Sequence, residues 1–295
     1  MVRQTFHLLG LLALLVPGAV RAGETQSAWP NQIAADLVRL AKVEWRVRIA
    51  AAHDCPARAP AAGLTIDYIG AYSPADRGLV RKQTGLGAWP QVLSVQQGGP
   101  ADSGGILPGD SIIAVGGADV MKLATTMDDP GLLADHLYDI IATSRPGVPL
   151  SIVVRRAGRT LSLNLMPRMI CSARFVFKDH KGIAAYTDGS TVAIASGAID
   201  FAANDDELAL IAGHELAHII AHDKAPASLF DRRTMEDDAD LLGARLALCA
   251  GYDVARSLDF WKRLATRDPA HGPAHRSAME RHARLAAAMS GLSCI

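Results

Sequence analysis

Two histidines and a glutamate lie close together in a segment with helical apolar spacing. His214, Glu215 and His218 form an H-E-x-x-H pattern between Asp205 and Ile220, and the acidic start of this segment is typical of a helix N-terminus. Side chains four residues apart share one helix face, so both imidazoles can bind one Zn²⁺ ion. Glu215 would stand beside them and accept a proton from a zinc-bound water. The alternative is two core histidines packed around a capping glutamate.

A catalytic zinc site needs a third protein ligand and an open position for water. A third histidine six residues after His218 is excluded, because position 224 is Lys, and we interpret His222 as a neighbour of the site or a surface residue. Glu236 and Asp240 lie at i and i+4 in the next helical segment. Glu236 can therefore bind the metal while Asp240 accepts a hydrogen bond from a ligand histidine. A solvated acidic face is the alternative.

These patterns resemble the gluzincin metallopeptidases of the HtpX-like and CAAX-prenyl-protease family, peptidase family M forty-eight. The similarity runs from about Ala184 to Leu285 and includes the segment from His275 to Arg281. The resemblance implies that His275 lies near the metal, where it would hydrogen-bond the developing oxyanion or fill the open coordination position. Packing of the last helix is the alternative role for His275 and Arg281. The family's strand-opening Asn is Ala here, at position 184 or 185, so that residue's substrate-binding role does not carry over.

A Gly-rich region precedes this segment and has the pattern of short strands. Residues 97–117 contain P-A followed by G-x-x-P-G-D-x-I-x-x-V-x-G, which resembles PDZ domains of the HtrA type. The resemblance implies a groove that receives peptide C-termini by β-augmentation. The loop and strand assigned to that groove are Gly63, Leu64, Thr65 and Ile66, with Gly85-Leu86-Gly87 as a competing loop. A PDZ-like module that only packs against the protease is the alternative.

Apolar periodicity predicts the remaining elements. We expect a helix over 29–53, a helix over 132–143, and an almost entirely helical chain from residue 205 on, with Glu207 capping the zinc-binding helix. Strands are predicted over 64–69, 92–95, 111–115, 150–155, 160–165 and 192–199, with a hairpin turn at 157–159.

The predicted fold class is therefore α+β, with a mostly helical H-E-x-x-H zincin domain that has a small β-sheet, and a β-rich PDZ domain inserted after the first helix. The predicted boundaries are a signal peptide over 1–22, the N-terminal helix of the protease domain over 23–56, the PDZ domain over 57–167, and the zinc metallopeptidase domain over 168–295.

The chain has four cysteines, which would form one or two disulfides in an oxidising compartment. Of the three pairings, we favour Cys55 with Cys171 and Cys249 with Cys294, because each pair would tie the edges of one predicted segment. Buried free thiols remain the alternative for the second pair.

The amino terminus and the charge balance indicate the compartment. Residues 1–22 carry an early Arg, a short apolar stretch and a small-x-small end, which predicts a cleaved signal peptide and a periplasmic or secreted protein. An uncleaved anchor is the alternative, and no other segment is long and apolar enough to cross a bilayer, so we expect no transmembrane span in the mature chain. Thirty basic and thirty acidic residues balance, which disfavours a nucleic-acid partner.

The function predicted from these features is an exported zinc-dependent endopeptidase with one Zn²⁺ per chain. Its expected substrates are polypeptides, namely unfolded or misassembled envelope proteins, hydrolysed by a Glu215-activated zinc-bound water. One rival is a PDZ-containing peptide-binding adaptor or chaperone with a structural or latent zinc site. A metalloenzyme that acts on a non-peptide envelope polymer is another, disfavoured because H-E-x-x-H is mostly peptidase chemistry.

Overall fold

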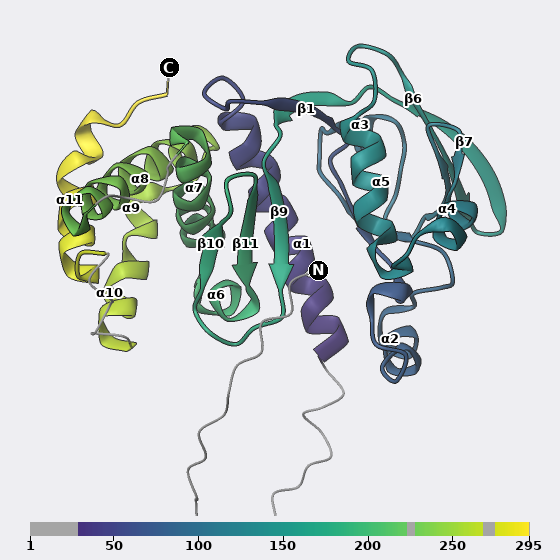
Figure 1. Cartoon of the computed structure of the whole chain (residues 1–295), viewed down its shortest axis with the longest axis horizontal. Coiled ribbons are helices and arrows are strands. Elements are labelled where there is room, and N and C mark those ends of the chain that lie inside the picture. The colour runs from purple at the N-terminus through teal and green to yellow at the C-terminus, as the bar shows by residue number, and fades with distance from the viewer. Residues whose placement is uncertain (1–28, 223–227, 268–274, 295) are drawn as a thin grey trace, which may run out of the picture.

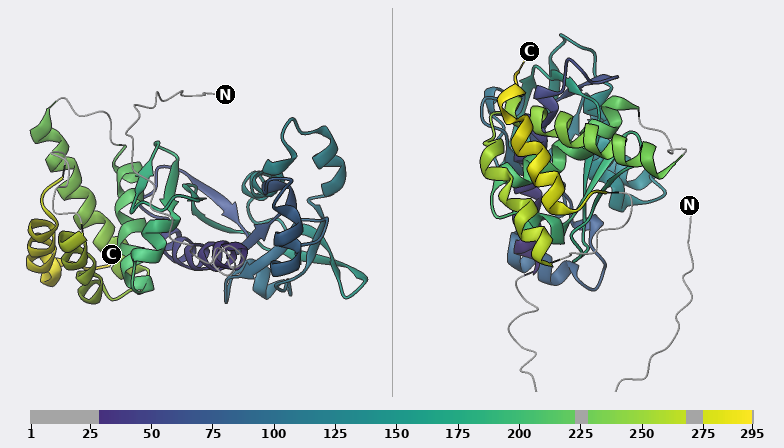
Figure 2. Two further views of the ribbon diagram at one scale, coloured as in Figure 1. Left: turned by 90° about the horizontal axis from the view of Figure 1, so that it is seen from below. Right: turned by 90° about the vertical axis from the view of Figure 1, so that its left-hand side faces the viewer.

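The computed structural model describes residues 29–222, 228–267 and 275–294, which form a mixed α/β molecule whose helices and strands lie in two parts (Figure 1 and Figure 2). Each part has a hydrophobic core of its own. We call the part built around the first core the helical lobe (residues 29–57 and 166–294) and the part built around the second core the sheet lobe (residues 58–165). The predicted signal peptide lies outside the described residues. No helix among the described residues is long and apolar enough to span a membrane.

The helical lobe consists of a long first helix, a three-stranded sheet and a succession of helices. The strand order is β10-β11-β9, with β11 parallel to β9 and antiparallel to β10. Its elements are α1 (Trp29–Ala50), β8 (Arg168–Cys171), β9 (Arg174–Lys178), β10 (Ala185–Thr187), β11 (Thr191–Ala195), α6 (Ser196–Phe201), α7 (Asp205–Ala221), α8 (Leu229–Cys249), α9 (Val254–Ser257), α10 (Asp259–Arg267), α11 (Ala278–Ala288) and η3 (Met289–Gly291).

The sheet lobe is built on a six-stranded sheet with the order β2-β3-β4-β6-β7, in which β5 also pairs with β4. Its elements are β1 (Arg58–Ala61), β2 (Leu64–Asp67), η1 (Ile69–Ala71), α2 (Arg77–Thr84), β3 (Gln91–Val95), α3 (Pro100–Ser103), β4 (Ser111–Val115), β5 (Ala118–Asp119), α4 (Val120–Thr126), η2 (Pro130–Leu132), α5 (Leu133–Ala142), β6 (Leu150–Arg156) and β7 (Arg159–Leu165). The two-residue turn between β6 and β7 is Ala157-Gly158, and both residues have positive φ, as a tight hairpin requires.

The chain enters and leaves the sheet lobe at one place. β1 pairs antiparallel with β8, with Arg58 opposite Cys171, and Cys55 is bonded to Cys171. The second disulfide joins Cys249 to Cys294. Both favoured pairings are therefore present in the structure.

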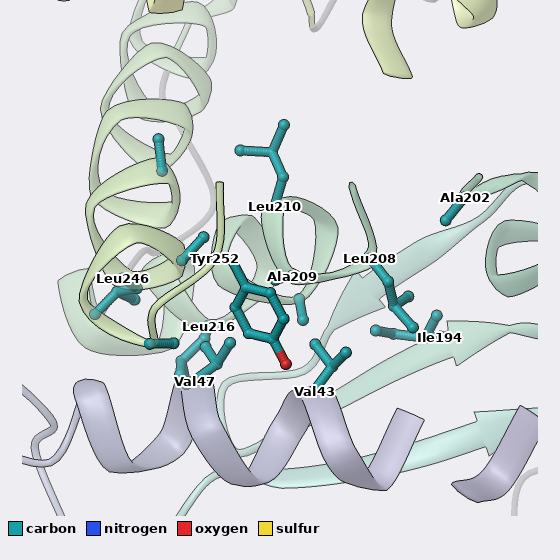
Figure 3. Packing of buried hydrophobic residues seen from close by; sticks show 14 of the residues in the cluster. Val43, Val47, Ile194, Ala202, Leu208, Ala209, Leu210, Leu216, Leu246 and Tyr252 are labelled. Carbon is teal, nitrogen blue, oxygen red and sulfur yellow. The ribbon is translucent and has the colours of Figure 1, made fainter. Parts of the chain in front are cut away.

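The first helix supplies one wall of the core under α7, the helix that carries the H-E-x-x-H pattern. Val43 and Val47 are fully buried and point from α1 toward Leu216 and Tyr252 (Figure 3). Burial of a valine side chain stabilises a fold by about 1.5–3 kcal/mol. The apolar stripe predicted over 29–53 thus holds α1 against α7, although the 108 residues of the sheet lobe fold elsewhere before the chain returns at β8 and β9.

Three predictions of local structure differ from the structure. The strand expected over 192–199 ends at Ala195, and the chain continues as α6, because the apolar run 196–199 is buried on a helix. The sheet lobe has helices α2 and α4 that the sequence did not indicate. Glu207 is not the N-cap of α7: Asn204 is, and its side chain accepts from the Glu207 amide at 3.0 Å.

Candidate metal centre

The H-E-x-x-H pattern lies on α7. His214 and His218 occupy successive turns of this helix, and their Nε2 atoms are 3.3 Å apart. α7 ends at Ala221, and the C-cap residue His222 has a left-handed conformation (φ 53°) and is exposed. His222 is thus a surface residue, which is one of the two positions expected for it.

Glu236 reaches the two histidines from the neighbouring helix α8. Its Oε2 atom lies 3.3 Å from Nε2 of His214 and 3.6 Å from Nε2 of His218. The three ligand-type atoms lie within 4.8 Å of one another. Two imidazole nitrogens and one carboxylate oxygen are a donor set that zinc prefers. Oε2 of Glu236 is buried and makes no hydrogen bond in the described part of the chain, so the residues fit a metal ion at this point.

The two helices cross with almost no space between them. A Cβ atom on Gly213 would lie 2.5 Å from the Gly243 carbonyl oxygen, and one on Gly243 would lie 2.5 Å from the amide nitrogen of His214. The absence of side chains at both positions lets α8 approach α7 directly beside His214. The sequence contains both glycines, but their juxtaposition is a property of the folded chain.

Gly243→Ala is expected to lower the free energy of unfolding by about 1–3 kcal/mol, because the new methyl group meets backbone that must move. Urea unfolding measures this change. The control is Gly78→Ala in α2, where a Cβ would meet nothing within 4 Å. That substitution is expected to stabilise the chain by up to about 1 kcal/mol. An equal fall in the free energy of unfolding of both variants would contradict the close contact between α7 and α8.

Asp240 orients His214 and is itself fixed by an arginine. Oδ1 of Asp240 lies 3.0 Å from Nδ1 of His214, and this leaves Nε2 directed at Glu236. Arg281 of α11 donates from Nε to Oδ2 of Asp240 at 2.7 Å and stacks on the ring of Trp261 at 3.8 Å. The arginine lowers the pKa of Asp240 to about 2 against the effect of burial. Packing of the last helix is the alternative role predicted for Arg281, and no sequence pattern indicates its contact with Asp240.

Glu215 lies beside the two histidines and is 8% exposed. Burial raises the pKa of its carboxyl, and the neighbouring His214 and His218 oppose that rise. Glu215 also lines a cavity of about 450 Å³ together with His214 and His275. A carboxylate with these surroundings can exchange a proton with a group bound in the cavity.

His275 comes to the same point from the start of the last helical segment. Its Nδ1 atom lies 3.1 Å from Oε2 of Glu236, and neither atom makes a hydrogen bond in the described part of the chain. Burial alone would raise the pKa of Glu236, but three facing imidazoles hold it well below its usual range. Four polar side chains thus converge on one small volume.

This convergence agrees with the result of comparison with known proteins. Residues 165–226 match the model of Peptidase family M48. The matched segment includes the complete H-E-x-x-H pattern and ends before Glu236. It supports a metallopeptidase, in a family that is typically zinc-dependent.

No curated protein sequence matches the chain. Among solved structures, HtrA-type protease AlgW with a decapeptide is 26% identical over 38% of this chain and 30% of that chain, with a TM-score of 0.29. The serine endoprotease from Yersinia pestis is 22% identical over 27% of this chain and 25% of that chain, with a TM-score of 0.22. The chain therefore spans less than a third of either protein, and TM-scores this low do not establish a shared fold.

Of the residues predicted to bind peptide C-termini, Gly63 comes directly before β2 and the other three lie on β2, at one edge of the six-stranded sheet. Gly63, Leu64, Thr65 and Ile66 line a second cavity, of about 740 Å³, between β2, α5, α1 and β9. The amide of Ile66 already donates to the hydroxyl of Tyr138 on α5 at 2.7 Å. The competing Gly85 loop ends α2: Gly85 has φ 75° and its amide donates to Arg81.

Proposed function

We propose that this chain is an exported zinc-dependent endopeptidase that hydrolyses peptide bonds in unfolded or misassembled envelope proteins. The observation that carries the proposal is the convergence of His214, His218 and Glu236 on one point, with Glu215 buried beside them at the wall of a cavity. A purely structural zinc site has no use for a carboxylate in that position.

His214, His218 and Glu236 would hold the metal. When bound, zinc polarises a carbonyl group and lowers the pKa of water. Glu215 would accept the proton of the attacking water on its carboxylate and return it to the leaving amine. His275 would donate a hydrogen bond to the substrate carbonyl oxygen as negative charge develops there.

Two features support export. The structure holds two disulfides, which form and persist in oxidising compartments. The predicted signal peptide supplies the route, and cleavage after Ala22 would give a periplasmic or secreted chain.

One observation favours a second candidate function, a PDZ-containing adaptor or chaperone whose zinc site is latent. His275 lies near enough to Glu236 to fill a fourth coordination position, which would leave none open for water. In that case peptide binding would persist without hydrolysis.

The proposal is tested by metal analysis together with an assay on unfolded casein. We expect about one zinc per purified chain, hydrolysis that a chelator abolishes, and recovery of hydrolysis when zinc is restored. Stoichiometric zinc without hydrolysis, with peptide binding intact, would instead support the latent adaptor.

We also propose that the edge of β2 receives peptide C-termini. Tyr138→Phe is expected to tighten binding of a C-terminal peptide several-fold, because the Ile66 amide then has no partner within the chain. Fluorescence anisotropy with a labelled peptide measures the change. The control is Tyr72→Phe, since the Tyr72 hydroxyl donates to Asp67 and not to the β2 backbone. Equal affinities in wild type and Tyr138→Phe would argue for a module that only packs against the helical lobe.

A further inference from the structure

The cavity beside Glu215 is lined in part by charged side chains that have no role in the proposed hydrolysis. It runs along one turn of α7, where Leu210 and Ile211 precede His214 and Glu215 by four residues, about 6 Å of helix. Opposite them, α10 contributes the apolar side chains of Phe260 and Leu264. Both are buried, so the walls can enclose a bulky apolar side chain.

Two exposed cations, Lys181 and Arg267, complete the lining of this cavity. Arg267 lies on α10, one turn after Leu264. It is also six residues, about 9 Å of helix, beyond Trp261. Trp261 stacks on Arg281, which lies beside His214. Neither cation forms an ion pair in the described part of the chain. Lys181 interacts electrostatically with the buried carboxylate of Asp36 but forms no ion pair with it. The guanidinium carbon of Arg267 lies 5.5 Å from the centre of the Phe201 ring.

The loop that carries Lys181 is held in place by the start of α6. The amide of Gly197 donates to the carbonyl of His180 at 2.9 Å, and the Ser196 hydroxyl donates to the same carbonyl at 3.0 Å. A Cβ on Gly197 would lie 2.2 Å from the Lys181 carbonyl oxygen, so this loop rests directly on the helix. The Lys181 backbone is thus a fixed part of the cavity wall.

We propose that this cavity selects substrates with a bulky apolar residue near the scissile bond and a carboxylate within reach of Lys181 and Arg267. The inference rests on the proposed function, because it names the substrate class of the same site. Apart from Glu215, no carboxylate of the described residues lines the cavity, so its two unpaired cations would be neutralised by the ligand. A carboxylate of this kind comes either from an Asp or Glu side chain or from a free C-terminus.

The test measures binding to the full mature chain with Glu215→Gln, loaded with zinc, so that no peptide is consumed. Labelled peptides share one sequence and end in Leu-Gln-amide, Leu-Glu-amide or Leu-Gln with a free carboxylate. We expect at least one of the two carboxylate peptides to bind about tenfold more tightly than the neutral amide. The peptide that shows the gain identifies the source of the carboxylate.

Lys181→Ala with Arg267→Ala is expected to bring the ratio of affinities close to one. The control is Arg256→Ala with Lys262→Ala, which changes the net charge equally at residues that pair with Asp206 and Asp259 and do not line the cavity. The control should keep the wild-type ratio. No preference in the parent protein, a preference that survives loss of both cations, or an equal fall in the control would overturn the inference. Failure of the proposed function is distinguishable, because a wild-type chain that hydrolyses nothing still returns these binding ratios.

Discussion

Glu215→Gln is expected to lower kcat for an unfolded protein substrate by about 10²–10⁴-fold while one zinc per chain is retained. The amide has nearly the same shape as the carboxylate, but it cannot accept the proton that hydrolysis must remove. Glu215 is not among the three residues whose ligand atoms converge, so the metal should remain bound. Hydrolysis of labelled casein and metal analysis of the same sample give both quantities.

The matched control is Glu280→Gln, at an exposed residue that accepts from the Ser277 amide at the start of α11. This variant should keep a kcat near that of wild type, since its carboxylate lies outside the cavity that Glu215 lines. A Glu215→Gln protein with full zinc and wild-type kcat would remove Glu215 from the proposed chemistry. Loss of zinc in that variant would assign Glu215 a role in metal binding instead.

Arg281→Met is expected to lower the free energy of unfolding of the metal-free chain by about 3–5 kcal/mol. Arg281 and Asp240 are both 7% exposed at their side chains, so removal of the arginine leaves a buried carboxylate without its cation. The variant should also bind zinc about 10–100-fold more weakly, because Asp240 orients His214. Urea unfolding in chelator measures the first effect, and competition with a zinc indicator measures the second.

Arg276→Met is the control for this prediction. Arg276 also pairs with a carboxylate of α8, Asp237, but its side chain is 33% exposed and Asp237 keeps a second partner in Arg284 at 3.1 Å. The free energy of unfolding is expected to fall by less than about 1 kcal/mol, and the zinc affinity is expected to stay unchanged. Equal losses in the two variants would show that burial of the Arg281 pair has no special effect.

Much of the local structure could be predicted because it depends on residues near in sequence. The apolar period over 29–53 became α1, and the tight turn predicted at 157–159 is the two-residue Ala157-Gly158 turn. The error at 196–199 has the same origin: a short apolar run fits a buried strand and a buried helix equally well.

The sequence by itself determined the spacing of His214, Glu215 and His218 on one helix, and the two cysteine pairs favoured for the chain. Those properties follow from the period of a helix and from the edges of segments that can be counted along the chain. The approach of Glu236 and His275, the stacking of Arg281 on Trp261, and the gathering of Lys181 and Arg267 around one cavity were decided by tertiary structure. Residues up to 100 positions apart meet there only because helices α7, α8, α10 and α11 pack around the site, and helix crossing depends on side-chain volume at contacts such as Gly213 with Gly243.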